Sequence, residues 1–173
     1  MKRILTTIAL FAITSLLFFS CKDDDNSTEK ETMPAIDMAA AKKTIEEANV
    51  AFSDLVKKGD STALAAMYAS DAKLMGANMP SITGTNNISA TFGEMFRMGI
   101  GGVTLTTSGI WGNESLLSEE GTFSLMDKAG KEIDKGKYIV LWKMEDGKWK
   151  IFRDCWNSDL PMPAPAKYAP GKK

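Results

Sequence analysis

Histidine is absent from all 173 residues of the sequence. Histidine is the side chain that most readily changes charge near neutral pH, and it is the commonest protein ligand of metal ions. Its absence excludes Ser-His-Asp and Cys-His catalysis and the zinc sites that depend on histidine, which leaves acid/base chemistry to carboxyl and phenol groups. We therefore expect no metal site and no cofactor.

Cysteine is scarce, with Cys21 and Cys155 as its two occurrences. If Cys21 is modified, as argued below, Cys155 has no partner and a disulfide framework is excluded. Without a histidine to activate it, Cys155 is interpreted as an inert, buried thiol rather than a nucleophile.

The chain has no excess of basic residues, with 21 lysines and arginines against 22 aspartates and glutamates. If the N-terminal segment that holds Lys2 and Arg3 is removed, 19 basic residues remain and the net charge is −3. Nucleic-acid binding proteins usually gather positive charge on one face, so we expect no nucleic acid as a partner.

A long apolar run is also missing, because the N-terminal run covers residues 4–19, shorter than the roughly 20 residues that span a membrane. It follows Lys2 and Arg3 and precedes the small residue Ser20, a pattern typical of a secretory signal. Residues 1–20 are therefore predicted to be an export signal.

The segment "LFFSC", which ends at Cys21, resembles a bacterial lipobox. The resemblance implies that Cys21 is lipidated and becomes the mature N-terminus; the alternative is a plain signal peptide cut nearby. The charged stretch that follows, "KDDDNSTEKETMP", resembles the signal of surface-exposed lipoproteins of the Bacteroidetes. We expect an acidic, disordered tether over residues 21–34 and a lipid anchor that holds the exported protein at the outer membrane or cell surface.

Helices are predicted in the first half of the folded part, residues 35–160. From Pro34 onward, apolar residues recur at three- and four-residue spacing, namely Ile45, Ala48, Phe52, Leu55 and Val56. Gly59 ends this helix, and Asp60 is expected to cap a second helix over residues 61–69. After a short strand and a return through Pro80, a third helix is expected to begin at a Thr85 cap and to end at glycines 99, 101 and 102.

Strands are predicted in the second half, over residues 103–111, 115–126, 137–144 and 148–156. A charged connection is expected over 127–136, and Asp146-Gly147 is a strong hairpin-turn signal. Gly109 and Gly121 are candidate bend or bulge sites. Residues 161–173 are rich in proline and predict an extended tail. Helices followed by strands predict an α+β fold, with helices on one face of a curved, mainly antiparallel sheet.

Three segments, "GDSTALAAMYASDAKLMG", "ITGTNNI" and "GKYIVLWKMEDGKWKIFRDCWNSDLP", are similar to the SnoaL-like and ketosteroid-isomerase-related domains of the nuclear transport factor 2-like superfamily. The resemblance covers about residues 37–161. It implies a cone-shaped, cystatin-like fold in which the sheet wraps the long helix and leaves a pocket. This fold hosts isomerases, cyclases, dehydratases, binding domains and dimerisation modules, so it does not decide the function.

The catalytic groups of the steroid isomerases are not found at the corresponding positions. By the resemblance, the general base falls at about Gly76 or Ala77, the helix tyrosine near Phe52 and the late-strand acid near Val140. None of these residues can move a proton or hold an enolate. The isomerase mechanism of that family is therefore not expected here.

Asp154 is the first candidate for a catalytic residue, because it lies in an apolar strand where burial would raise its pKa toward acid/base use. The alternative is a structural role, in which Asp154 pairs with Arg153 or with a loop amide near the strand end. Glu120 is a possible second carboxylate, although either Glu119 or Glu120 could be the one that faces inward. Strand alternation places Trp149 and Ile151 on one face and Phe152, Asp154 and Trp156 on the other, without showing which face is concave.

The ligand-binding candidates are aromatic, thioether and amide side chains near the ends of elements, namely Tyr68, Met75, Met79, Trp111, Trp156 and Asn157. Core packing is the alternative use of the aromatic residues and methionines. We therefore predict an envelope-tethered domain that binds a small, partly apolar molecule. Two alternatives remain open: an acid/base enzyme of isomerase, dehydratase or cyclase type that uses Asp154, and a homodimerisation module that associates through the sheet and has a filled pocket.

Overall fold

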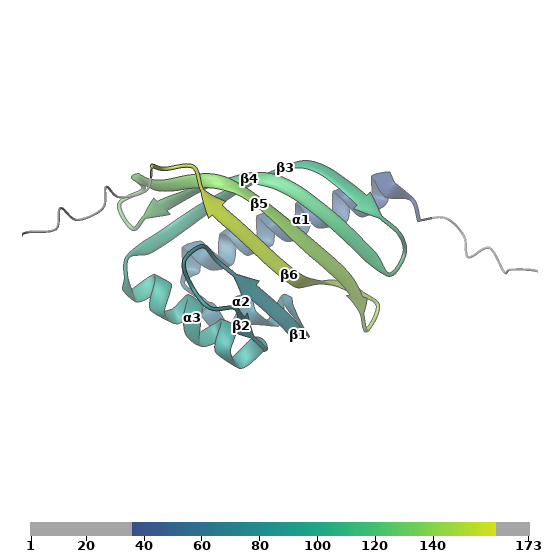
Figure 1. Ribbon diagram of the computed structural model, residues 1–173, viewed down its shortest axis with the longest axis horizontal. Helices are drawn as coiled ribbons and strands as arrows, with labels where there is room; N and C mark the ends of the chain where they lie inside the picture. The colour runs from purple at the N-terminus through teal and green to yellow at the C-terminus, as the bar shows by residue number, and fades with distance from the viewer. Residues whose placement is uncertain (1–35, 162–173) are drawn as a thin grey trace, which may run out of the picture. The chain divides into compact units, whose positions relative to one another are not determined.

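The computed structural model describes residues 36–161. The predicted signal and tether, and the tail beyond residue 161, lie outside the described residues. The described part folds as a sequence of helices followed by strands (Figure 1). The elements are α1 (Met38–Lys58), α2 (Ser61–Ala66), β1 (Tyr68–Met75), β2 (Ile82–Thr83), α3 (Thr85–Arg97), β3 (Ile100–Gly112), β4 (Leu116–Asp127), β5 (Glu132–Glu145) and β6 (Lys148–Ser158).

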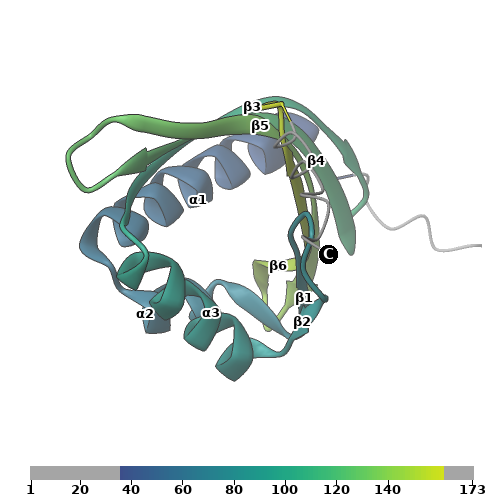
Figure 2. The same ribbon diagram turned by 60° about the vertical axis from the view of Figure 1, so that its left-hand side comes forward.

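The six strands form one sheet in the order β2-β1-β6-β5-β4-β3. All neighbouring strands are antiparallel except β1 and β6, which are parallel. Between these two strands the chain passes through β2, α3, β3, β4 and β5. Figure 2 shows the sheet curving around α1, with α2 and α3 on the same concave side. The α+β fold with three helices on a curved, mainly antiparallel sheet is thus confirmed.

Helix α1 carries the stripe that attaches it to the sheet. Asp37 caps its N-terminus by accepting hydrogen bonds from the backbone N–H groups of Ala39 and Ala40. Gly59 ends it in the left-handed conformation, with φ of 68°, which glycine adopts without strain. The buried positions recur about every four residues and are Ala41, Ile45, Asn49 and Val56. One of these four, Asn49, is polar, and its side chain contributes to the site described below.

The β5–β6 hairpin follows from the turn residues that link the two strands. Asp146 and Gly147 both have positive φ, 52° and 72°, and the flanking residues Glu145 and Lys148 pair with each other. Two residues with positive φ form the tight turn whose twist matches that of the strands. The sequence prediction for this turn is confirmed.

Strand β6 contains a β-bulge, which changes the faces predicted for its side chains. Arg153 pairs with Leu141, but Ile151 pairs with Trp142, so Phe152 is an extra residue between them. Because the bulge interrupts the alternation, Ile151 lies on the same inner face as Asp154 and Trp156. The predicted separation of Ile151 from Asp154 is wrong for this reason.

The second helix is shorter than predicted. It ends at Ala66 rather than residue 69, and Tyr68 is the first residue of β1. The carbonyl of Met67 accepts a hydrogen bond from the backbone N–H of Ile151 in β6, so pairing with a distant strand ends the helical conformation early. Helix propensity is a weak preference that such tertiary pairing overrides.

Two further boundaries differ from the predictions. Strand β5 begins at Glu132, because the second half of the segment predicted as a connection, residues 132–136, pairs with β4. Helix α3 has Gly84 rather than Thr85 as its N-cap, and the helix ends at Arg97. Gly101 belongs to β3, where a Cβ would lie 2.6 Å from the Lys128 backbone, so its lack of a side chain permits close strand approach.

The glycines expected at bends lie where the strands are irregular or closely covered. Gly109 follows Ser108, the extra residue of a bulge between β3 and β4.

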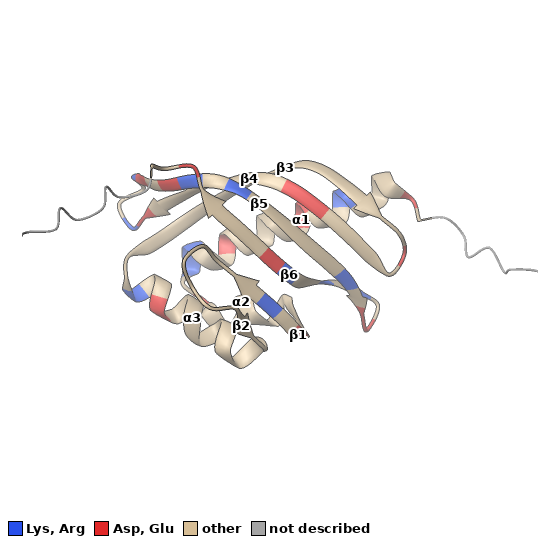
Figure 3. Cartoon of the chain, in the orientation of Figure 1, with Lys and Arg blue, Asp and Glu red and all other residues tan. Residues whose placement is uncertain are grey.

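Figure 3 shows acidic and basic residues interspersed along the helices and strands rather than gathered by sign. Within residues 36–161, no helix is both long enough and apolar enough to span a membrane.

Candidate functional site

A cavity of about 150 Å³ lies between α1, α3 and the concave face of the sheet. Its wall is almost entirely apolar, with aromatic side chains from helices and strands alike. The lining residues are Asn49, Phe52, Val56, Leu74, Phe92, Met95, Phe96, Ile100, Val103, Leu105, Phe123, Leu125, Tyr138, Val140, Trp142, Ile151, Asp154 and Trp156. A cavity of this volume accommodates a molecule about the size of benzene.

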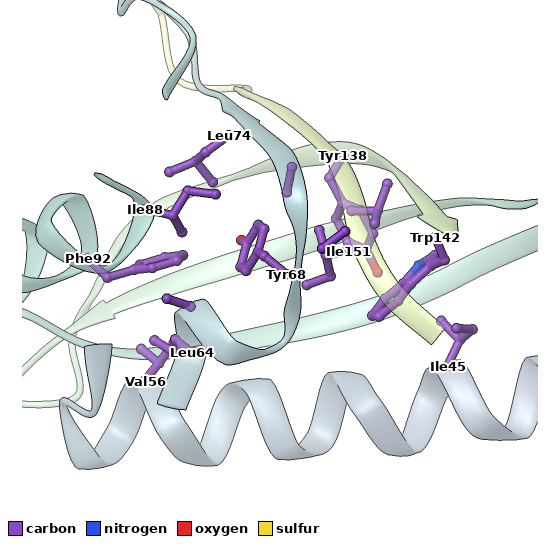
Figure 4. Close-up of a cluster of buried hydrophobic side chains, with 14 of the residues drawn as sticks. Ile45, Val56, Leu64, Tyr68, Leu74, Ile88, Phe92, Tyr138, Trp142 and Ile151 are labelled. Atoms are coloured by element: carbon purple, nitrogen blue, oxygen red, sulfur yellow. The ribbon is translucent and has the colours of Figure 1, made fainter. Parts of the chain in front are cut away.

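The helical side of the aromatic wall is built by α1 and α3. The rings of Phe52 and Phe92 meet edge to face with centroids 5.9 Å apart, and Phe92 and Phe96 stack at 6.4 Å. Tyr68 projects from β1 toward Phe92, with ring centroids 6.0 Å apart (Figure 4). Spacing of four residues places Phe92 and Phe96 on the same face of α3, which is how a short amphipathic helix can form one side of a cavity.

Asp154 is the one charged residue in the described lining. The hydroxyl of Tyr68, which is itself buried, donates a hydrogen bond of 2.6 Å to Asp154 Oδ2. Burial raises the pKa of Asp154 to about 6; the hydrogen bond from Tyr68 opposes this rise, and the negative charge of Glu119 adds to it. A carboxyl group with this pKa is ionised at neutral pH and can take up a proton after a modest change in conditions.

Glu119 forms a second, deeper carboxylate cluster. It is completely buried, and its Oε1 accepts hydrogen bonds from Asn49 Nδ2 at 2.6 Å, Thr107 Oγ1 at 2.7 Å and Tyr138 Oη at 2.8 Å. Its Oε2 accepts one from Trp142 Nε1 at 2.9 Å. Four donors from α1, β3 and β5 therefore satisfy the carboxylate, which is the condition under which a buried charge is tolerated.

Gly121 lets Tyr138 reach this cluster. The two residues pair across β4 and β5, and a Cβ at Gly121 would lie 2.5 Å from the Tyr138 ring. The ring thus lies directly over the glycine, with its hydroxyl on Glu119. Burial, the nearby charge of Glu119 and the hydrogen bond to it together raise the pKa of Tyr138 far above its ordinary value, so the phenol remains a donor.

Three of the residues predicted for the site come together in the structure. Asp154 and Trp156 line the cavity, and Tyr68 holds Asp154 from the β1 side. Trp156 packs on Gly76, where a Cβ would lie 2.6 Å from the indole ring and 2.7 Å from the sulfur of Met79. The predicted Met79 thus lies beside a lining residue rather than in the lining.

The other predicted residues lie outside the described cavity. Alternate residues of β4 face inward, and Glu119 is one of them, so its neighbour Glu120 is exposed. The choice of Glu120 as second carboxylate is therefore corrected. Trp111 is 54% exposed and covers Gly109, and Asn157 is exposed at the end of β6. Met75 is half-buried in β1 without joining the lining.

Cys155 is also exposed, in contrast to the buried thiol that was expected. It follows the inward Asp154 and therefore faces the convex side of the sheet, as alternation requires beyond the bulge.

Asn49, Thr107 and Tyr138 are the residues of the Glu119 cluster that the sequence reasoning missed, and Glu119 itself was left as the alternative to Glu120. Asn49 carried a usable signal, because it lies four residues after Ile45 on the apolar stripe of α1. A polar residue on such a stripe must find a buried partner. No comparable signal identifies Thr107, since threonine is common on both faces of strands.

The two positions that the sequence resemblance assigned to the helix tyrosine and the late-strand acid of steroid isomerases are apolar. Phe52 and Val140 both line the cavity, and each contributes only carbon atoms. The one ionisable carboxyl group in the described lining is that of Asp154, which is hydrogen-bonded by Tyr68 and lies in a different strand from Val140.

The sequence model of the SnoaL-like domain matches residues 50–152, which is more than half of the chain. The chain therefore belongs to the SnoaL-like domain family. A search of the curated proteins finds no significant match.

Solved structures with the same fold include a protein of unknown function with a cystatin-like fold from Nostoc punctiforme, at a TM-score of 0.63 and 21% identity over 72% of this chain and 96% of that one. A ketosteroid isomerase-like protein from Erwinia carotovora has a TM-score of 0.59 and 20% identity, covering 69% and 96%. A protein described as a candidate scytalone dehydratase from Novosphingobium aromaticivorans has a TM-score of 0.60 and 19% identity, covering 71% and 87%. At these identities the likeness establishes the nuclear transport factor 2-like, cystatin-like fold.

Proposed function

We propose that this domain binds a small, mostly apolar molecule in the cavity between α1, α3 and the sheet. The observation that carries the proposal is the cavity of about 150 Å³ with apolar walls and one ionisable group, Asp154, at its surface. Ligand sites typically combine apolar walls with a few placed polar groups. The cavity also argues against the alternative of a dimerisation module with a filled pocket.

The presence of Asp154 in an apolar wall supports a functional role. A carboxylate in an apolar wall opposes folding when it is ionised, and its raised pKa of about 6 expresses that cost. An apolar residue at this position would complete the wall of the cavity without this cost to stability. Functional sites commonly hold groups that are unfavourable for stability.

The proposal is tested by filling the cavity. Leu105 lines it, whereas the next residue, Thr106, is exposed on the opposite face of β3. Leu105→Trp should abolish binding of benzyl alcohol, a benzene-sized probe, and the matched control Thr106→Trp should not. Binding is measured by NMR titration on the domain that spans residues 34–173, with circular dichroism to show that each variant is folded.

Benzyl alcohol binding that survives Leu105→Trp in a folded variant, or no binding by the unaltered domain, would refute the proposal. Native mass spectrometry of the untagged protein purified from its own cell envelope adds an independent readout, because a co-purifying small molecule should disappear from Leu105→Trp.

Acid/base catalysis on the bound molecule is the second candidate function, and the Asp154–Tyr68 pair favours it. A general acid or base works best when its pKa lies near the operating pH, and Asp154 has a pKa of about 6. The test follows deuterium incorporation next to the carbonyl of cyclohexanone in D₂O by NMR. Exchange faster than buffer, and lost in Asp154→Asn, would support catalysis; equal rates in both would leave binding alone.

We further propose that Cys21 anchors the protein to the cell envelope through a lipid. The support is the "LFFSC" segment and the charged stretch that follows it. Cells supplied with an alkyne-labelled fatty acid should label the protein and retain it in the membrane fraction. Cys21→Ala should lose both the label and the membrane retention; an unlabelled parent chain would reject the anchor.

A further inference from the structure

The electrostatic character of the cavity is negative without compensation. Asp154 lies in the lining, Glu119 lies behind it, and none of the lining residues within the described range 36–161 is a lysine or arginine. The arginine beside Asp154 does not neutralise it, because Arg153 faces outward and lies over the Phe152 ring at 3.6 Å. A bound molecule therefore meets negative charge in an apolar surrounding, where charge interactions are stronger than in water.

The hydrogen-bond donors around the cavity are already occupied. Tyr68 donates to Asp154, while Tyr138 and Trp142 donate to Glu119. The side-chain amide of Asn49 donates to both Glu119 and Thr107, which uses its two N–H groups. Among the described lining residues, the indole N–H of Trp156 is the one side-chain donor without such a partner.

An acceptor, by contrast, remains open. Oδ2 of Asp154 is held by Tyr68, and no donor within residues 36–161 is bonded to Oδ1. Every fully buried side-chain nitrogen and oxygen of the described part has a partner, so this oxygen retains accessible surface. Asn49 also lines the cavity, and its Oδ1 likewise accepts no hydrogen bond within residues 36–161. Of these two open acceptors, the free oxygen of Asp154 is the one that belongs to an ionisable group.

We propose that the cavity selects a compact hydrophobic amine, whose protonated nitrogen donates to Asp154 while its apolar body lies among the aromatic rings. This inference rests on the proposed function, since it names the class of molecule for the same cavity. Ammonium groups are attracted to aromatic faces, and the lining offers Phe52, Phe92, Phe96 and Trp156. A carboxylate of the same size would instead meet two negative side chains and a single free donor.

The pH dependence of this selection follows from the groups that face Asp154. These are Tyr68 from β1, Glu119 from β4 and Tyr138 from β5, and both tyrosines have raised pKa values and stay neutral. The facing residues of α1 and α3 are uncharged. Because Asp154 has a pKa of about 6, the preference for an ammonium ion should hold at pH 7.5 and decline as the pH falls below about 6.

The test compares three probes of one size: benzylamine, benzyl alcohol and benzoate. At pH 7.5 we expect benzylamine to bind about tenfold more tightly than benzyl alcohol, the difference between a charge-assisted and a neutral hydrogen bond. Benzoate should bind more weakly than both. Asp154→Asn should remove the preference for the amine while benzyl alcohol still binds, and Glu120→Gln, one residue from the buried Glu119 but exposed, should leave all three affinities unchanged.

The outcomes separate this inference from the function on which it rests. If benzyl alcohol binds in the cavity and benzylamine binds no more tightly, the amine inference is overturned and the binding site stands. If the amine preference persists in Asp154→Asn, the assigned partner is wrong. If none of the three probes binds, the binding function itself fails.

Discussion

Glu119 and Asp154 are two carboxylates in one domain, both enclosed by the same helices and sheet, but their surroundings differ. Glu119 accepts four hydrogen bonds, whereas Asp154 accepts one. A carboxylate surrounded by donors holds the parts of a fold together, and one left with an open oxygen keeps its capacity for a ligand. The comparison indicates that burial alone does not mark a functional acid; unfilled hydrogen-bonding capacity does.

The strongest way to break this comparison is to remove the structural carboxylate. Glu119→Ala leaves donors on Asn49, Thr107, Tyr138 and Trp142 without their acceptor. Each buried unpaired donor costs roughly 1–3 kcal/mol, so we expect the free energy of unfolding to fall by about 4–6 kcal/mol, with water entering to relieve the rest. Urea denaturation measures it, and Glu119→Gln should lose about half as much. A loss below about 1 kcal/mol would show that the cluster does not stabilise the fold.

Neutralising the other carboxylate should have the opposite sign. The pKa of Asp154 is raised from 3.8 to about 6, so the folded state holds the proton more strongly and stability falls as pH rises from about 4 through about 6. Asp154→Asn should therefore stabilise the protein at pH 7.5 by about 3 kcal/mol, at roughly 1.4 kcal/mol per pKa unit, and by little at pH 4. Thermal and urea unfolding at both pH values measure the difference. Destabilisation by Asp154→Asn at pH 7.5 would contradict the conclusion that the ionised Asp154 side chain opposes folding.

Removing the single donor to Asp154 sharpens the contrast further. Tyr68→Phe deletes the hydrogen bond that lowers the pKa of Asp154, so this pKa should move above 6. We expect a loss of about 2 kcal/mol in the free energy of unfolding at pH 7.5, typical of a hydrogen bond to a charged group, and a smaller loss at pH 5. The pKa is read from the carboxyl carbon resonance by NMR, and a downward shift would contradict the prediction.

The smallest effect is expected one residue away from the largest. Glu120 is exposed on the convex face, in the same strand as Glu119. Glu120→Gln should change the free energy of unfolding by less than about 0.5 kcal/mol, because exposed side chains without special contacts contribute little. The free energy of unfolding of Glu120→Gln is measured beside those of the Glu119 variants. The comparison shows whether the inward or outward orientation of each glutamate in β4 decides its role.

The sequence predicted the fold well because its signals are local and repeated. The spacing of Ile45, Phe52 and Val56 predicts a helix that packs with one face, and Asp146-Gly147 predicts the turn that pairs β5 with β6. These signals need no knowledge of distant residues. Tyr68 shows the limit, since its strand conformation depends on pairing with β6, more than eighty residues later.

The site was predicted only in part, for a related reason. Alternation in β4 shows that Glu119 and Glu120 face opposite ways, but periodicity cannot say which face the helices will cover. In β6 the bulge at Phe152 changes the alternation itself, and no residue type in the segment signals it. Asp154 was identified by its apolar neighbours; the four donors on Glu119 converge from α1, β3 and β5, and only the folded chain brings them together.

The extra residue in β6 also affects how relatives are compared. Counting in steps of two from Trp149, an uninterrupted strand would turn Arg153 and Cys155 toward the interior, whereas here Asp154 and Trp156 take those places. A homologue that lacks the insertion would therefore present different chemistry at equivalent positions in a gapless alignment. Transfer of catalytic assignments across this family should begin by locating such one-residue offsets, since a gain or loss of a single codon can exchange one functional group for another without altering the architecture.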